Sequence, residues 1–215
     1  MENVTAAEKY LLCALKYGYT FDNNVRVPLI ITTIIEMALE GNLEIIENNK
    51  IVLTDKIPTI NYHKHVYDAI KCKRKNISIK TLLLVMCEYR VKEAANAVRI
   101  VNQNLINKGL IKIEYEKRLF SKKENIIINN EQFNIYMQEI NTQLLREQEA
   151  STDVILLTNL LYTTKYLEKI FTKSEIENIK KKFIEMNNTI INEKIKLIKP
   201  VLRTITTVDF CRIFD

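Results

Sequence analysis

Two long segments of the chain, 29–39 and 153–171, are apolar on nearly every side. A helix that is apolar all round must be buried on several sides. Polar residues such as Lys165 interrupt the second segment, and neither segment has the ~20 apolar residues of a membrane-spanning helix. We therefore expect both segments to lie side by side at the centre of a single domain formed by residues 1–215.

The rest of the pattern predicts a mainly α fold. The chain has three glycines and three prolines in 215 residues, which disfavours a turn-rich all-β structure. Thr5 and Glu8 have the spacing of a capping box that starts a helix, and Gly18 has the place of its left-handed cap. Pro28 is expected to open the second helix, where its missing amide proton has no effect. The further helices expected are 62–71, 78–89, 92–108, 131–149, 153–171, one capped by Ser174 that runs to about residue 198, and 201–214.

Two β-hairpins are expected beside these helices. Strands 43–47 and 50–54 are joined by two asparagines that tolerate positive φ, and a second hairpin is expected from 110–115 and 117–120. Each hairpin follows a helix end and a glycine, Gly41 or Gly109. The repeated pattern indicates two helix–helix–hairpin units in one domain.

No motif of a catalytic or metal site is present in the sequence. Three scattered glycines cannot build a phosphate-binding loop, and no G-x-S-x-G occurs. His63 and His65 are two residues apart, point away from each other on a helix, and are expected to be exposed. The acidic residues are expected on solvated helix faces. We therefore predict a protein that is not an enzyme and has no cofactor or metal. The cysteines, which form no CxxC pair, are Cys13, Cys72, Cys87 and Cys211.

The formal net charge of +6 favours acidic partners, either lipid head groups or nucleic acid. The densest basic run, 71–75, fits a solvated helix end as well as contact with an anionic surface. The first sixteen residues carry charges and lack the apolar region of a signal peptide. The expected location is cytoplasmic, with any membrane contact peripheral and on the cytoplasmic face.

Four segments along the chain resemble the Golgi phosphoprotein 3 family. They are the leucine-rich opening helix with EKYLLCAL at 8–15, the Gly-Tyr-Thr turn at 18–20, IIEMALEGNL at 34–43 and NLINKGLI at 104–111. The apolar helix 153–171 is also similar to a leucine-rich helix of the family. The order and spacing of these segments carry the resemblance from about residue 7 to residue 196.

The resemblance implies a central helical bundle surrounded by further helices, with β-hairpins at the edge. It also implies a function, because family members bind phosphatidylinositol 4-phosphate on Golgi membranes and hold protein tails for sorting. A hairpin serves self-association in the family, so a homo-oligomer through the 110–120 hairpin is expected.

The site residues implied by the resemblance begin with Phe21 and Arg26. The family has a tryptophan in the loop after the Gly-Tyr turn, and Phe21 is the aromatic residue of the shorter loop here. The family's arginine at the start of the buried helix falls on Ile30, and Arg26 is the nearest replacement.

Two further family arginines fall on Ala95 and Val98, close to Lys92 and Arg99. A phosphate site needs converging cations, so the expected lipid-binding set is Phe21, Arg26, Lys92 and Arg99. These departures, and the expected lack of an acidic N-terminal tail, suit a divergent bacterial relative.

Two alternatives remain open from the sequence. Residues 78–120 also follow the order of a winged-helix DNA-binding domain, although the second helix offers few basic residues and the equivalent first-unit helix has none. Nucleic acid is the less favoured partner for that reason. The second alternative is a protein-interaction adaptor without lipid affinity, with the edge of the 110–120 hairpin as its contact surface.

Overall fold

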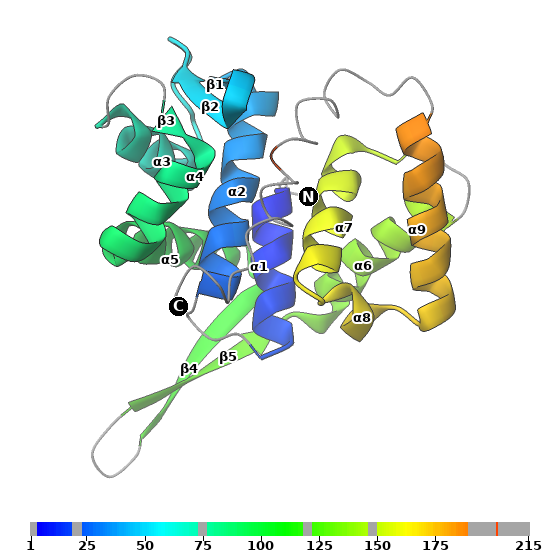
Figure 1. Ribbon diagram of the computed structural model, residues 1–215. Coiled ribbons are helices and arrows are strands. Elements are labelled where there is room, and N and C mark those ends of the chain that lie inside the picture. Colours follow the sequence, from blue (N-terminus) through cyan, green and yellow to red (C-terminus); the bar gives the residue numbers. More distant parts are fainter. Residues whose placement is uncertain are drawn as a thin grey trace.

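Three buried helices form the centre of the molecule (Figure 1). α1 (Ala6–Lys16) lies between α2 (Asn23–Leu39) and α7 (Thr152–Thr163), and α2 and α7 also touch each other. Most of the side chains of α2 and α7 are buried. Both apolar segments are therefore confirmed as core helices, although α1 is the main neighbour of each.

Further helices surround this centre. The computed structural model describes residues 4–18, 23–72, 77–117, 122–145, 150–188 and 201. Within them, α3, α4 and α5 pack on one side of the centre and α6, α8 and α9 on the other (Figure 1), which confirms the mainly α fold with β-hairpins. The remaining elements are β1 (Leu43–Ile46), β2 (Lys50–Leu53), α3 (Asn61–Lys71), β3 (Ile77–Ser78), α4 (Ile79–Leu83), a π-helical turn (Leu84–Tyr89), α5 (Val91–Asn107), β4 (Ile111–Lys117), β5 (Lys122–Ile128), α6 (Asn130–Leu145), α8 (Leu167–Ile170) and α9 (Lys173–Asn188).

One cluster of buried apolar side chains draws members from every helix from α1 to α9. Fully burying a side chain such as leucine contributes about 1.5–3 kcal/mol. Because all of these helices contribute to the same cluster, their buried side chains form one common core. The described helices thus share one core, and the single domain formed by residues 1–215 stays a prediction.

The start of α1 has the predicted capping box. The Thr5 hydroxyl accepts from the Glu8 amide at 3.3 Å, and the Glu8 carboxylate accepts from the Thr5 amide at 3.0 Å. Gly18, after the end of the helix, has a φ of 92°, as expected for a left-handed cap.

The start of α2 differs from the prediction. Pro28 does not open the helix but lies inside it, five residues after its first residue, Asn23. A proline inside a helix donates no hydrogen bond to the carbonyl four residues earlier, here that of Asn24. The Tyr10 hydroxyl of α1 donates to this carbonyl at 3.2 Å. A donor from the neighbouring helix thus replaces the missing backbone bond.

The repeated helix–glycine–strand pattern has the same hydrogen bonds in both copies. The Asn42 amide donates to the Met37 carbonyl at 2.8 Å, and the Leu110 amide donates to the Leu105 carbonyl at 2.9 Å. Gly41 and Gly109 have φ values of 78° and 67°. These are Schellman caps, in which a left-handed residue turns the chain from helix into strand.

Each cap leads into a hairpin. β1 pairs with β2 as predicted, and the short strand β3, which the sequence did not indicate, adds to β2. The second hairpin is longer than predicted, because its second strand is β5 rather than 117–120. Its register sets Ile113 opposite Ile126, and the hairpin projects from the helical body (Figure 1).

The second apolar segment is two helices rather than one. α7 ends at Thr163, and Lys165 has a φ of 61°, so the chain turns before α8 begins. The next helix, α9, is capped by Thr172 and not by Ser174. The Thr172 hydroxyl accepts from the Glu175 amide at 3.3 Å, and the Glu175 carboxylate accepts from the Thr172 amide at 2.8 Å.

Candidate functional site

Arg26 lies in α2 close to its start and is half-buried. Its Nε atom is shielded from solvent and has no hydrogen-bond acceptor among the residues that the structure describes. Burial raises the pKa of the Cys87 thiol in the π-helical turn to about 12, and the positive charge of Arg26 opposes this rise. Arg26 therefore lies near the segment that leads into α5.

Lys92 and Arg99 lie on the exposed face of α5, with Asn96 between them. They are two helical turns apart, about 10 Å along the axis. Neither makes an ion pair with a described residue. The structure thus brings Lys92 and Arg99 to one helix face and puts Arg26 on a neighbouring helix.

The positions that the resemblance aligns with the family's arginines are apolar and largely buried. Ile30 and Val98 are both 0% exposed, and Ala95 is half-buried. An arginine at either fully buried position would displace core packing and bury an unpaired charge. Any phosphate site on this chain therefore uses other cations. The predicted Phe21 lies outside the described residues.

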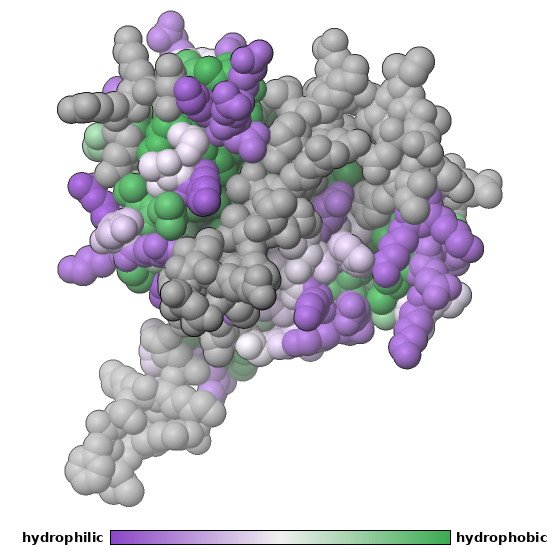
Figure 2. All heavy atoms as spheres, in the orientation of Figure 1, coloured by the Kyte–Doolittle hydropathy of each residue, from purple (hydrophilic) through white to green (hydrophobic). Residues whose placement is uncertain are grey.

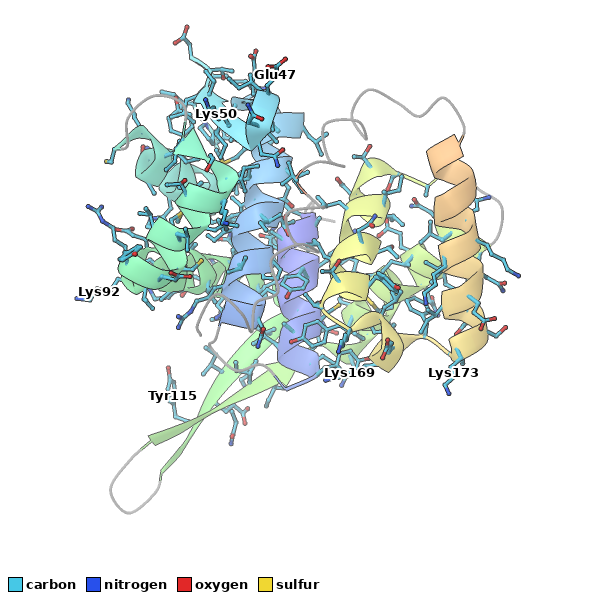
Figure 3. All side chains as sticks on the ribbon, in the orientation of Figure 1. Glu47, Lys50, Lys92, Tyr115, Lys169 and Lys173 are labelled. Atoms are coloured by element: carbon cyan, nitrogen blue, oxygen red, sulfur yellow. The ribbon has the colours of Figure 1, made fainter. Side chains whose placement is uncertain are left out.

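Three lysines that sequence reasoning missed lie at the end of the molecule where α1 ends. The Lys169 Nζ donates to the Tyr17 carbonyl at 3.1 Å and lies over the rings of Tyr17 and Tyr166. Lys16 is at the end of α1 and Lys173 at the start of α9. Figure 3 shows Lys169 and Lys173 at the same end of the molecule.

We call this end, with Lys16, Arg26, Lys169 and Lys173, the basic end. The end of α1 and the start of α2 meet there, since only residues 19–22 separate Gly18 from α2. In Figure 2, hydrophilic side chains gather over α8 and α9 on this side of the molecule. The acid Glu168 is also exposed on α8, so the basic end is not uniformly positive.

A buried carboxylate joins three helices elsewhere in the molecule. Glu36 of α2 accepts from the Ala7 amide at 2.9 Å, from the Tyr62 hydroxyl at 3.0 Å and from the His63 Nε2 at 2.8 Å. His63 is 0% exposed, so its predicted exposure is wrong. The prediction failed because a neighbouring helix, remote in sequence, covers this face of α3.

The same network continues to Glu8, whose predicted solvation is also wrong because it is only 1% exposed. Glu8 accepts from the Lys108 Nζ at 2.7 Å and from the Asn104 side-chain Nδ2 at 3.3 Å. The Tyr62 hydroxyl connects the two halves, since it lies 2.6 Å from the Thr5 hydroxyl. Burial raises the pKa of Tyr62, and the nearby charge of Glu36 adds to this effect. Most of these groups satisfy one another, which is the pattern of a structural network, but the buried His63 Nδ1 has no hydrogen-bond partner among the described residues and lies 3.4 Å from the Glu40 carboxylate.

The described residues form neither a metal-binding cluster nor a membrane-spanning helix. No three or more of their His, Cys, Asp and Glu side chains are arranged to hold a metal ion. None of the helices in the described part of the chain has the length and apolar character needed to cross a membrane.

Comparison of the sequence with protein-family models gives no matching family, and comparison with curated proteins gives no matching relative.

Proposed function

We propose that the chain is a non-catalytic, peripheral membrane adaptor that binds an anionic lipid head group, phosphatidylinositol 4-phosphate or a similar one, at the basic end. The observation that carries the proposal is Arg26, whose Nε lacks an acceptor among the described residues although it is buried. A buried donor without a partner costs about 1–3 kcal/mol, and more when it is charged. A bound phosphate offers acceptors for this guanidinium.

Arginine suits this role because its planar guanidinium donates paired hydrogen bonds to a phosphate. Arg26 is half-buried, so water screens its charge less than the charge of a fully exposed lysine.

The lysines of the basic end support binding at longer range. Each Lys or Arg close to an anionic membrane surface contributes about 1 kcal/mol. Lys16, Lys169 and Lys173 come from two parts of the sequence and lie at the end where α1 leads into α2. Phe21 belongs to the segment between these helices, and we propose it as the aromatic contact with the head-group layer.

The adaptor role also needs a protein contact, and we assign it to the β4–β5 hairpin. Tyr115 is 60% exposed and Ile127 is 46% exposed on this projecting element. The hairpin is a two-stranded sheet among the described strands, so its outer edges are open to pairing. A second copy of the chain is the partner that we propose for it.

The DNA-binding alternative depends on the helix–hairpin unit of α5, β4 and β5. A winged-helix domain carries a third strand beside its hairpin, but β3 pairs with β2 of the first hairpin. This pairing argues against the DNA-binding alternative.

Vesicle flotation tests the proposal with phosphatidylcholine vesicles, with and without phosphatidylinositol 4-phosphate. We expect Arg26→Gln to weaken association with the phosphoinositide vesicles about tenfold, because it removes a charge-assisted contact. Arg26→Lys keeps the charge but loses the paired donors, so its vesicle association should be intermediate between that of the natural chain and that of Arg26→Gln. Lys50→Gln is the matched control, because Lys50 lies at the opposite end of the molecule in Figure 3.

Three results would contradict the proposal. The first is equal flotation of the chain with both kinds of vesicle or with neither. The second is equal weakening by Arg26→Gln and Lys50→Gln, which would indicate net charge alone. The third is tight binding to duplex DNA in a gel shift without vesicle association, which would favour the DNA-binding alternative.

A further inference from the structure

A pocket of about 160 Å³ lies between α3, the π-helical turn and the start of α5, and none of the four residues of the basic end lines it. Met86, which lines it, is almost fully buried, whereas Asp68 and Arg90 are exposed. The pocket therefore has an apolar inner part and charged groups at its mouth. We propose that it binds a small zwitterion, with a cationic amine at Asp68 and an anionic group at Arg90.

The π-helical turn places Arg90 at this pocket. The Arg90 amide donates to the Val85 carbonyl five residues earlier at 2.8 Å, which is the hydrogen bond of a π-helix. Arg90 itself leaves the helical conformation, with φ of −126° and ψ of 56°, before α5 begins. Such turns are rare and are found frequently at functional sites, because the inserted residue redirects the side chains that follow.

The charges that line the pocket divide into one contacting pair and two groups without an ion-pair partner among the described residues. His65 and Glu93 contact each other, with the His65 Nε2 3.0 Å from the Glu93 carbonyl and 3.4 Å from its carboxylate. Asp68 and Arg90 make no ion pair with each other or with any other side chain in the described part of the chain. Two opposite charges that line one hollow without pairing match a ligand that carries both charges.

The size of the pocket limits the ligand to a few atoms. A protein cavity of about 150 Å³ holds a benzene molecule, so a pocket of about 160 Å³ has room for a ligand of similar size. A ligand with about five to eight non-hydrogen atoms fits this space. Free amino acids such as serine and the head group O-phosphoethanolamine have the required charges and size. We expect a dissociation constant in about the millimolar range, well short of the limit for ligands of this size, because the two charged contacts lie at the exposed mouth of the pocket.

Methyl NMR of the full chain labelled at its methionines tests the proposal, because Met86 lines the pocket and its methyl group reports on an occupant. Met86→Leu assigns the signal among the five methionines. The probes are serine and O-phosphoethanolamine, with ethylamine and inorganic phosphate as the two single charges. We expect a saturable shift of the Met86 signal with a zwitterion. With either singly charged probe, the apparent dissociation constant should be at least about tenfold higher.

Two substitutions separate the roles of the charges. Asp68→Asn and Arg90→Gln should each weaken zwitterion binding about tenfold, whereas Lys64→Gln, an exposed residue of the same helix α3, should leave it unchanged. Vesicles that contain phosphatidylethanolamine compete with the soluble probe if the natural source is a lipid head group, and do not compete if it is a free molecule. No shift up to about 50 mM, or equal shifts with a single charge, would overturn the proposal.

Discussion

Lys169 donates a hydrogen bond from its Nζ to the backbone carbonyl of Tyr17 at 3.1 Å, across 152 positions of the sequence. The same Nζ lies 5.9 Å from the centre of the Tyr17 ring and 5.3 Å from that of Tyr166. The two rings are stacked with an interplanar angle of 26°. This contact fastens α8 to the end of α1, beside the segment that carries Phe21.

We expect Lys169→Met to lower the free energy of unfolding by about 1 kcal/mol. The substitution keeps the length of the side chain but removes the hydrogen bond and the cation–π contacts, which contribute about 0.5–1 kcal/mol at exposed sites. Urea denaturation measures the change. Lys173→Met is the control, since Lys173 is exposed and should change stability by no more than about 0.5 kcal/mol. Equal effects of both substitutions would contradict the role given to Lys169.

Local features of the fold were predictable because neighbouring residues encode them. The capping box of Thr5 and Glu8 and the left-handed caps at Gly41 and Gly109 depend on residues a few positions apart. Apolar periodicity likewise located most of the helices. The place of Pro28 was not predictable, because the donor that compensates for it is Tyr10 on another helix.

The candidate site was predictable only in its residue types. The resemblance implied Arg26 as a phosphate-binding cation, which stays a prediction, whereas its burial and missing acceptor among the described residues depend on how α2 packs. Lys169 reaches the end of α1 through tertiary structure alone. His63 could not be recognised as buried either, since its partner Glu36 belongs to another helix. The position of Arg90 follows from a π-helical turn, which periodicity does not reveal.

The Tyr10 hydroxyl should stabilise the fold more when residue 28 lacks an amide proton. We expect Tyr10→Phe to cost about 1 kcal/mol in the natural chain, because the Asn24 carbonyl loses this donor. In a Pro28→Ala background the new amide can donate to Asn24 instead, so the cost should fall by about 0.5 kcal/mol or more. A double-mutant cycle in urea measures this coupling. Equal costs in both backgrounds would contradict it.

Glu36 is expected to be the most sensitive carboxylate of the buried network. Glu36→Gln puts an amide that carries donors against the Tyr62 hydroxyl and the His63 ring, so at least one buried donor loses its acceptor. We expect a loss of about 2–3 kcal/mol in the free energy of unfolding.

Glu44→Gln provides the matched control for this substitution. Glu44 is exposed on β1, so the same chemical change should alter stability by no more than about 0.5 kcal/mol. Urea denaturation of the two variants compares them directly. A loss at Glu36 as small as the loss at Glu44 would show that the hydrogen bonds of Glu36 do not stabilise the fold.

Stability should decrease at alkaline pH because of Cys87. Burial raises the pKa of its thiol from 9.0 to about 12, although the nearby Arg26 opposes the rise. Between these values the unfolded chain releases a proton that the folded chain keeps, so stability is complete below about pH 9 and falls as the pH rises. One such group changes the free energy of unfolding by about 1.4 kcal/mol per pH unit.

Cys87→Ala should therefore make the decline of the free energy of unfolding with pH shallower by about 1.4 kcal/mol per pH unit, which corresponds to one proton. The decline should not vanish, because burial also raises the pKa values of Tyr62 and Cys13. Urea denaturation at several pH values between 8 and about 11 measures the slope. Cys72→Ala is the control, since Cys72 is exposed in the folded chain and its substitution should leave the slope unchanged. The burial of Cys87 between α2 and α5 argues that its thiol titrates differently in the folded and unfolded chain. An identical slope in the natural chain and in Cys87→Ala would contradict this.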